Sequence, residues 1–222
     1  YDGVIVLRRY SRPLLSQIKG NSRNIVYTGL NPIGDPYDQV VCDGYAAAKA
    51  AVRYLHLLGH GGIGYLGEKT EEVRYSGYYD AMQEFRLPLR REYIIETEQS
   101  MQGGYLAGKK ILTAIPASSE AVATRPTAIF CANDSTAVGA LKAFQENGVQ
   151  VPKEISVISI DNTDICQLSS PMLTSIHIPK EDLGKISVKT LMDRIEGGHT
   201  LPMKIEIPFT LVVRESCARL EL

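Results

Sequence analysis

The sequence predicts an α/β protein in which parallel β-sheets are flanked by helices. Several short apolar runs are continuous rather than alternating, as in strands that are buried on both faces of a sheet. Longer stretches between them repeat apolar residues at helical spacing, and this alternation is typical of a parallel sheet. The predicted strands are Val4–Leu7, Asn24–Tyr27, Ile63–Leu66, Tyr93–Ile95, Ala128–Ala132, Ile155–Ile160 and Ser175–Ile178.

Three of the longer stretches have clear helix boundaries. The predicted helices are Ala47–Leu58, Ser135–Asn147 and Leu183–Ile195. Each is followed by a glycine that can end it, at Gly59, Gly148 and Gly197. For the second helix we expect Asp134 or Ser135 to be the N-cap, with Asp134 preferred.

Composition and charge restrict the class of protein. The chain has 222 residues, a net charge of −1, 44% hydrophobic residues and 22% charged residues, which are ordinary values for a soluble globular protein. No apolar run approaches the roughly 20 residues of a membrane span. The near-neutral charge argues against nucleic-acid binding by this segment. Cysteines 42, 131, 166 and 217 form no CxxC pair, which favours a reducing cytoplasm over a disulfide framework.

Polar side chains follow several predicted strands. Arg8 ends the first run, Arg74 comes shortly after Ile63–Leu66, and Asn133 and Asp161 each follow a later strand. Open parallel sheets bind ligands beyond the carboxyl ends of their strands. A guanidinium donates in a fixed fork, a carboxylate accepts from hydroxyls, and an amide does both. We therefore expect Arg74, Asn133 and Asp161 to hold a small polar ligand.

Motifs for catalysis and cofactors are missing from the sequence. Gly62–Gly67 fits GxGxxG, but its glycines fall within a predicted strand instead of between a strand and a helix. The histidines show no HExxH or Cys/His spacing, and the sequence has no GxSxG elbow. We predict no catalytic residue, no cofactor and no metal site, and we expect that the chain is not an enzyme.

Blocks along nearly the whole chain carry a resemblance to a known family. Leu58-Gly59-His60 precedes the strand at Ile63, Arg74-Tyr75-Ser76-Gly77-Tyr78 fits "R..GF", and Pro126–Asp134 fits "PTAIFAAND". Val151–Asn162 fits "VPEDVSVVGFDD", and the last blocks are Leu173–Ile176 and Leu211–Ser216 ("LTTV" and "LVVRES"). The chain thus resembles the effector-binding domain of the lactose/galactose-repressor (LacI/GalR) family of transcriptional repressors.

The resemblance implies a two-lobed, periplasmic-binding-protein-like fold. It places the N-lobe at residues 1–42 and 179–207, and the C-lobe at residues 43–178 and 208–219. It also assigns effector contacts to Arg74, Asn133 and Asp161. Gln99 falls where relatives often place a stacking aromatic, and Cys42 where many carry Phe. These two departures leave the identity of the effector open, although a sugar is expected. If Arg8 faces the crevice, a phosphorylated or acidic effector becomes an alternative.

The resemblance also implies partners and preceding segments. Family members are homodimers, and the analogous contacts here are Val138, Lys142 and Ser169–Met172. Operator DNA would be read only through a helix-turn-helix head that precedes this sequence. The first β-α-β-α unit of the N-lobe, about 60–70 residues at typical element lengths, is also expected before Tyr1. The N-lobe is then incomplete, and strand Val4–Leu7 would have an open edge.

One alternative shares the same fold. A periplasmic-type sugar-binding protein of a transport system would have the same two lobes and the same strand-end polar residues. The Leu58-Gly59-His60 block and the ending Leu211–Ser216 favour the regulator.

Overall fold

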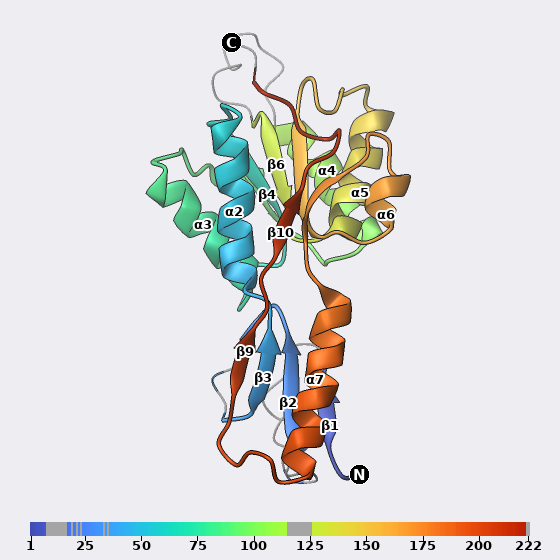
Figure 1. Ribbon diagram of the computed structural model, residues 1–222. Helices are drawn as coiled ribbons and strands as arrows, with labels where there is room; N and C mark the ends of the chain where they lie inside the picture. Colours follow the sequence, from blue (N-terminus) through green and yellow to red (C-terminus); the bar gives the residue numbers. More distant parts are fainter. Residues whose placement is uncertain are drawn as a thin grey trace. The chain divides into compact units, whose positions relative to one another are not determined.

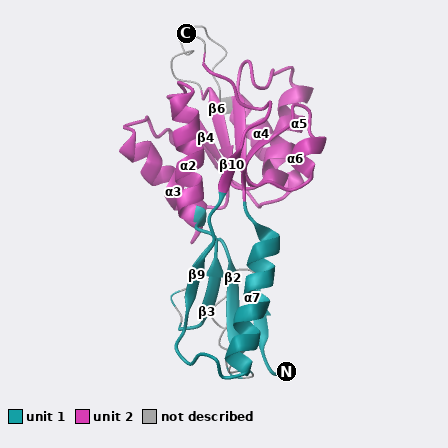
Figure 2. Cartoon of the chain, viewed as in Figure 1, with its two compact units in different colours: residues 1–44, 178–209 teal, residues 45–177, 210–222 magenta. Residues whose placement is uncertain are grey.

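The computed structural model describes residues 1–7, 17, 18, 20, 22, 24–32, 34, 36–114 and 126–220. The chain divides into two compact units (Figure 2). Unit 1 consists of Tyr1–Gly44 and Ile178–Phe209, and unit 2 of Tyr45–His177 and Thr210–Leu222. Each unit has a sheet of its own. Arg8 lies outside the described residues.

The sheet of unit 1 has the strand order β1-β2-β3-β9, and all of its pairings are parallel. Helix α7 (Lys180–Ile195) lies along this sheet (Figure 1). The predictions of strands at Val4–Leu7 and Asn24–Tyr27 are confirmed, whereas β3 and β9 were not predicted because both are short and partly polar. The strands are β1 (Val4–Val6), β2 (Ile25–Gly29), β3 (Asp38–Val41) and β9 (Lys204–Glu206).

The register of unit 1 separates its two faces. Ile5 pairs with Val26, and Val26 pairs with Asp38, so these residues lie on the same face. Asp38 contacts Arg194 of α7, which identifies this face as the one that the helix covers. The opposite face carries an apolar cluster of Val6, Ile25, Tyr27 and Val41 with Val4, Ile18 and Tyr37 packed against it.

Asp38 forms a buried ion pair at one corner of unit 1. Its side chain has 0% exposure and accepts hydrogen bonds from Arg194 Nη2 (2.8 Å), His199 Nε2 (2.9 Å) and Met203 N (2.8 Å). Burial alone raises the pKa of Asp38, but the bonds from Arg194, Met203 and His199 lower it overall. Nδ1 of His199 also contacts the carboxylate of Asp193. Because both ring nitrogens face carboxylates, the imidazole donates twice and is protonated.

The sheet of unit 2 has the strand order β10-β8-β7-β6-β4-β5. All pairings are parallel except that of β10 with β8, which is antiparallel. The strands are β4 (Ile63–Gly67), β5 (Ile94–Glu96), β6 (Ala128–Cys131), β7 (Ser156–Asp161), β8 (Thr174–His177) and β10 (Thr210–Val212). The five predicted strands of this unit are confirmed to within one residue at each end, and β10 was not predicted.

Helices cover both faces of the sheet of unit 2. Figure 1 shows α2 and α3 on one side and α4, α5 and α6 on the other. The helices are α2 (Gly44–Leu57), α3 (Val73–Glu84), α4 (Met101–Ala114), α5 (Asp134–Glu146) and α6 (Ile165–Leu168), with a 3₁₀ turn at Arg91–Tyr93. None of the helices described is long and apolar enough to cross a membrane. The predicted α/β fold with parallel sheets flanked by helices is confirmed.

Two facing glycines bring α4 and α5 into close contact. A Cβ atom on Gly104 would lie 2.1 Å from the carbonyl oxygen of Thr136, and one on Gly139 would lie 2.1 Å from that of Met101. Any larger residue would therefore push the helices apart. This close packing fixes the start of α5, and with it the polar residues that precede the helix.

His60 ties the C-terminal segment to unit 2. Its Nε2 lies 3.0 Å from the carbonyl oxygen of Ala218, and its Nδ1 lies 2.9 Å from Oγ1 of Thr127. A carbonyl can only accept, so Nε2 donates and Nδ1 accepts from the threonine hydroxyl. Burial lowers the pKa of His60, which keeps the imidazole neutral.

Candidate functional site

The carboxyl ends of five parallel strands form one edge of unit 2. We call this the carboxyl edge. Neighbouring strands in the order β8-β7-β6-β4-β5 end there, and open parallel sheets bind ligands at this position. Four residues predicted to form the site lie at these strand ends: Asp161 is the last residue of β7, and Arg74, Gln99 and Asn133 come after β4, β5 and β6.

Arg74 is held by several partners at this edge. It is the second residue of α3 and is 7% exposed. Its Nε donates to Glu72 Oε1 (2.8 Å), and its Nη2 donates to Glu72 Oε2 (2.9 Å) and Gln99 Oε1 (2.8 Å). Its Nη1 donates to the carbonyl oxygen of Ala132 (2.8 Å). Among the described residues these bonds use four of the five guanidinium N–H groups, which leaves one N–H on Nη1 for a ligand.

Glu72 is a site residue that sequence reasoning missed. It is the N-cap of α3, and its carboxylate accepts from the backbone N–H of Arg74 (3.1 Å) as well as from the guanidinium. The side chain is 2% exposed. Burial raises the pKa of Glu72, but the hydrogen bonds and charge of Arg74 lower it overall, so the carboxylate is ionised. The Glu-x-Arg spacing at a helix start was the signal for this pair.

The charge on Arg74 is correspondingly stabilised. Burial by itself lowers the pKa of Arg74, but the carboxylate of Glu72 and then the charge of Asp161 raise it overall. Arg74 and Asp161 therefore lie within electrostatic reach of each other although they follow different strands.

Asn133 and Asp134 have roles that differ from the prediction. The preference for Asp134 as the N-cap of α5 was wrong: Asn133 is the N-cap, and its Oδ1 accepts from Thr136 N (2.9 Å). Asp134 is buried as the first residue of α5 and accepts from Ser159 Oγ (2.6 Å) and Ser175 Oγ (2.7 Å), and from both N and Oγ1 of Thr163. Residues that are 25 or more positions away in the sequence thus donate all of these hydrogen bonds to the Asp134 carboxylate. Asn133 Nδ2 reaches the carbonyl oxygen of Gln99 at 3.4 Å, a weak bond that a ligand could replace.

Asp161 has an unusual backbone conformation. Its φ is +118°, and the next residue, Asn162, has φ of +49°. Non-glycine residues rarely adopt positive φ, and strained positions of this kind concentrate at functional sites. The Asp161 side chain is half-buried at the end of β7. Its position is fixed in part by Asn162, whose N–H donates to Ser175 Oγ (3.1 Å) and whose Oδ1 accepts from Arg214 Nη2 (2.7 Å).

Cys42 belongs to the other unit. It directly follows β3 in unit 1, it is buried with 0% exposure, and its thiol is not in a disulfide. Burial raises the pKa of the Cys42 thiol to about 11, so the side chain stays protonated. Its assignment as an effector contact remains a prediction.

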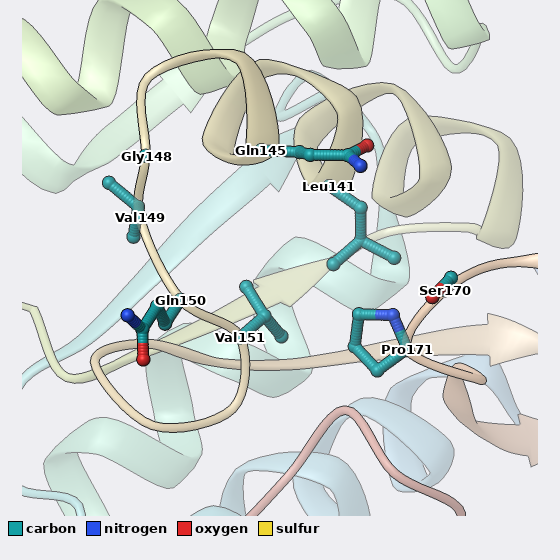
Figure 3. Close-up of a pocket in the computed structure, with 8 residues that line it drawn as sticks. All are labelled: Leu141, Gln145, Gly148, Val149, Gln150, Val151, Ser170 and Pro171. Carbon is teal, nitrogen blue, oxygen red and sulfur yellow. The ribbon is translucent and has the colours of Figure 1, made fainter.

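A surface pocket of about 270 Å³ lies elsewhere in unit 2 (Figure 3). It is lined by Leu141, Gln145, Gly148, Val149, Gln150, Val151, Ser170 and Pro171. None of these side chains is charged. Leu141 and Gln145 belong to the second half of α5, whereas the carboxyl edge is at the start of that helix. The pocket is therefore separate from the candidate site. Among the described residues no group of three or more His, Cys, Asp or Glu side chains is arranged to hold a metal ion.

Comparison with known proteins identifies the class to which this fold and edge belong. Residues 52–217 match the periplasmic binding protein-like domain family, and the chain belongs to that family. The two-lobed, periplasmic-binding-protein-like fold class expected from the sequence is thereby confirmed.

Within that class, the chain is similar to LacI-family regulators. It is 36% identical over 225 residues to the transcriptional repressor PurR of Yersinia pestis bv. Antiqua (strain Antiqua), covering 98% of this chain and 63% of the relative. It is 33% identical over 227 residues to the repressor MelR of Bacillus subtilis (strain 168), covering 97% of this chain and 63% of the relative. The chain thus spans less than two thirds of the length of these curated relatives.

A solved structure extends the comparison. The LacI family transcriptional regulator from Enterococcus faecium with bound ribose matches with a TM-score of 0.83 and 27% identity, over 99% of this chain and 81% of that one. The resemblance to the effector-binding domain of the LacI family, read from the sequence blocks, is confirmed. The relatives are named as transcriptional regulators, which agrees with the expectation that the chain is not an enzyme and does not favour the transport alternative.

Proposed function

We propose that this chain is the effector-sensing domain of a LacI-family transcriptional regulator and that its effector is a sugar. The observation that carries the proposal is the carboxyl edge of unit 2, where Arg74, Asn133 and Asp161 lie at the ends of neighbouring strands. Sugar hydroxyls both donate and accept, which suits a carboxylate beside a guanidinium and an amide. The Enterococcus faecium regulator with bound ribose supports a sugar as the ligand class.

The test is binding of a panel of neutral sugars, measured by calorimetry and by the shift in unfolding temperature. Asp161→Ala should weaken affinity by about 1–3 kcal/mol, as for a lost hydrogen bond to a polar partner. Asp161→Asn keeps a side chain that tolerates positive φ, so it separates the lost carboxylate from backbone strain. Asp164→Ala, an exposed aspartate three residues away, is the matched control. Unchanged affinity in both Asp161 variants would contradict the assignment.

The remaining parts of the proposal concern the whole regulator. Units 1 and 2 would be the N-lobe and C-lobe, Gln99 and Cys42 would be further effector contacts, and operator DNA would be read by a separate head. The regulator would then act in the cytoplasm. An effector can shift DNA affinity only through its different affinities for two states, and the coupling is reciprocal. Operator DNA should therefore change effector affinity by the same factor as the reverse.

We also propose a homodimer formed through unit 2. Leu168 is 83% exposed and Met172 is 37% exposed, and in the sequence both lie within two residues of Ser170, which lines the pocket in Figure 3. Apolar side chains gathered beside a pocket are typical of an interaction surface. Sedimentation should give a dimer for the native chain and a weaker one for Leu168→Asp, with Leu106→Asp, which replaces an exposed leucine of α4, as control. A monomer of 24.4 kDa at high concentration would contradict this proposal.

A further inference from the structure

We infer that Glu72 makes the effector site selective for an uncharged ligand by cancelling the charge of Arg74. The inference rests on the proposed function, because it concerns the same carboxyl edge. It assigns a specificity role to a residue that holds the arginine and need not touch the ligand. The ligand class it predicts is a neutral polyhydroxyl compound, and the class it excludes is the phosphate esters and carboxylates.

The first argument is the geometry of the pair. Both carboxylate oxygens of Glu72 face the guanidinium, at 2.8 Å from Nε and 2.9 Å from Nη2. Gln99 Nε2 also donates to Glu72 Oε2 at 3.2 Å, so the amide holds both members of the pair. A bidentate pair of this kind is what an anionic ligand would form with a vacant arginine. Here a residue of the protein itself already occupies that position.

The second argument is burial. Glu72 is 2% exposed and Arg74 is 7% exposed, so solvent screens their charges poorly. Moving Glu72 aside to admit an anion would leave a carboxylate without its partner in a buried position. Breaking a buried pair in this way is strongly unfavourable. A neutral hydroxyl needs only the remaining N–H of Arg74 and does not displace Glu72.

The third argument is the charge around the pair. In the described segments that follow the parallel strands β4, β5, β6 and β7, the basic residues are Lys69 and Arg74, and Arg214, which follows β10, donates to Asn162 at the same edge. Lys69 lies 3.2 Å from Glu96 and Arg74 is paired with Glu72, so both of these cations have a carboxylate partner. The acidic residues are more numerous: Glu68, Glu71, Glu72, Glu98, Asp134 and Asp164 in the same segments, and Asp161 at the end of β7. This edge therefore has a negative field, which repels anions and leaves neutral ligands unaffected.

The test compares Glu72→Gln with the native chain. The amide is the same size as the carboxylate and removes its charge, so Arg74 becomes available to an anion. Inorganic phosphate, against sodium chloride of equal ionic strength, should leave the unfolding temperature of the native chain unchanged and raise that of the variant. Removing one opposing charge at this distance should tighten phosphate binding about tenfold or more. Glu71→Gln, which removes the same charge from an exposed neighbour, should bind no more phosphate than the native chain.

A second measurement needs no variant. The native chain is offered matched pairs of sugars and their esters, such as ribose with ribose 5-phosphate and glucose with glucose 6-phosphate. We expect every ester to bind more weakly than its parent sugar, or not at all. An ester that binds more tightly than its parent, or phosphate that stabilises the native chain as much as Glu72→Gln, would overturn the inference.

The outcomes also separate this inference from the proposed function. If neutral sugars fail to bind but phosphate still distinguishes Glu72→Gln from the native chain, the sugar proposal is wrong and the charge inference stands. If sugars bind and their esters bind more tightly, the proposed function stands and the charge inference is wrong. If Glu72→Gln does not fold, the ester pairs decide the question in the native chain.

Discussion

Each unit of this protein buries one carboxylate against an arginine, and the two pairs differ in what surrounds them. In unit 1, Asp38 accepts from Arg194, His199 and the backbone of Met203, all at one corner of the unit. In unit 2, Glu72 accepts mainly from Arg74, two residues away, at the edge where strands end. The first pair joins segments more than 150 residues apart, and the second holds a side chain in position for a ligand.

The difference shows that burial of an ion pair does not by itself indicate a functional site. A buried pair needs well-placed hydrogen bonds to offset its desolvation, and both pairs have them. Each guanidinium makes four hydrogen bonds to described residues, but only the Glu72–Arg74 pair lies at the carboxyl edge, near Asp161, whose backbone has positive φ. The surroundings of the pair therefore distinguish a structural role from a binding role.

The largest effect is expected for the pair in unit 1. Asp38→Asn should destabilise unit 1 by about 3 kcal/mol or more, because it leaves the Arg194 guanidinium without a counter-charge in a mostly buried position. Urea unfolding with pulse thiol labelling gives the midpoint of each unit, since Cys42 is buried in unit 1 and Cys131 in unit 2. The control is Asp193→Asn, whose side chain is 53% exposed and which should cost less than about 1 kcal/mol. Equal losses of unit 1 stability in the two variants would show that the Asp38–Arg194 pair does not stabilise the unit more than an exposed contact does.

A smaller loss is expected for the pair in unit 2. Glu72→Gln should lower the stability of unit 2 by about 1–2 kcal/mol, because Arg74 keeps its bonds to Ala132 and Gln99 and an amide oxygen remains as acceptor. The same labelling of Cys131 measures this change, with Glu71→Gln as the control. A loss as large as that of Asp38→Asn would place the two pairs in one structural class and remove the contrast between them.

The two units should also respond to pH with opposite signs. Hydrogen bonds to Asp193 and then to Asp38 raise the pKa of His199 above its ordinary 6.5. The contribution of His199 to the stability of unit 1 is therefore complete below pH 6.5 and is lost as pH rises through the raised pKa. Burial lowers the pKa of His60 below 6.5. The contribution of His60 to the stability of unit 2 is therefore complete above pH 6.5 and is lost as the pH falls below 6.5.

Unit-resolved unfolding checks this pH prediction. Urea titrations at several pH values, each followed by a hydrogen-exchange pulse at one fixed pH, give separate midpoints for β2–β3 and for β6–β7. His199→Gln should flatten the alkaline loss in unit 1, and His60→Gln should flatten the loss in unit 2 just below pH 6.5. The same pH slope in both units, or slopes unaffected by these variants, would contradict the assigned protonation states.

The smallest effect is expected for the amide that supports the second pair. Gln99→Ala removes the acceptor for Arg74 Nη2 and the donor to Glu72 Oε2, but the two charged partners still satisfy each other. We expect a loss of about 1 kcal/mol in the stability of unit 2. Gln102→Ala, on the exposed side of α4, is the control. If Gln99→Ala abolishes sugar binding without a change in stability, the amide contacts the ligand directly.

The sequence by itself determined the elements whose signal is local. Short continuous apolar runs such as Ile63–Leu66 and Ala128–Ala132, which alternate with helix-period stretches, are typical of strands buried on both faces of a sheet, so they predicted the parallel strands of unit 2. The order of the motif blocks from Leu58-Gly59-His60 to Leu211–Ser216 indicated the resemblance to the LacI/GalR family. Polar residues placed directly or shortly after predicted strands led to Arg74, Asn133 and Asp161, since the carboxyl ends of parallel strands lie at one edge.

Only the tertiary structure decided which partner each polar group has. Asp134 and Asn133 are equally good N-caps by sequence, but Ser159, Thr163 and Ser175 come together around Asp134 and leave the cap to Asn133. Likewise, the sequence does not distinguish Glu72 from the acidic residues near it. In the structure, Gln99 and Ala132, from two other strand ends, hold Arg74 against Glu72. Hydrogen-bond partners across strands depend on distances in space, which the spacing of residues along the chain does not record.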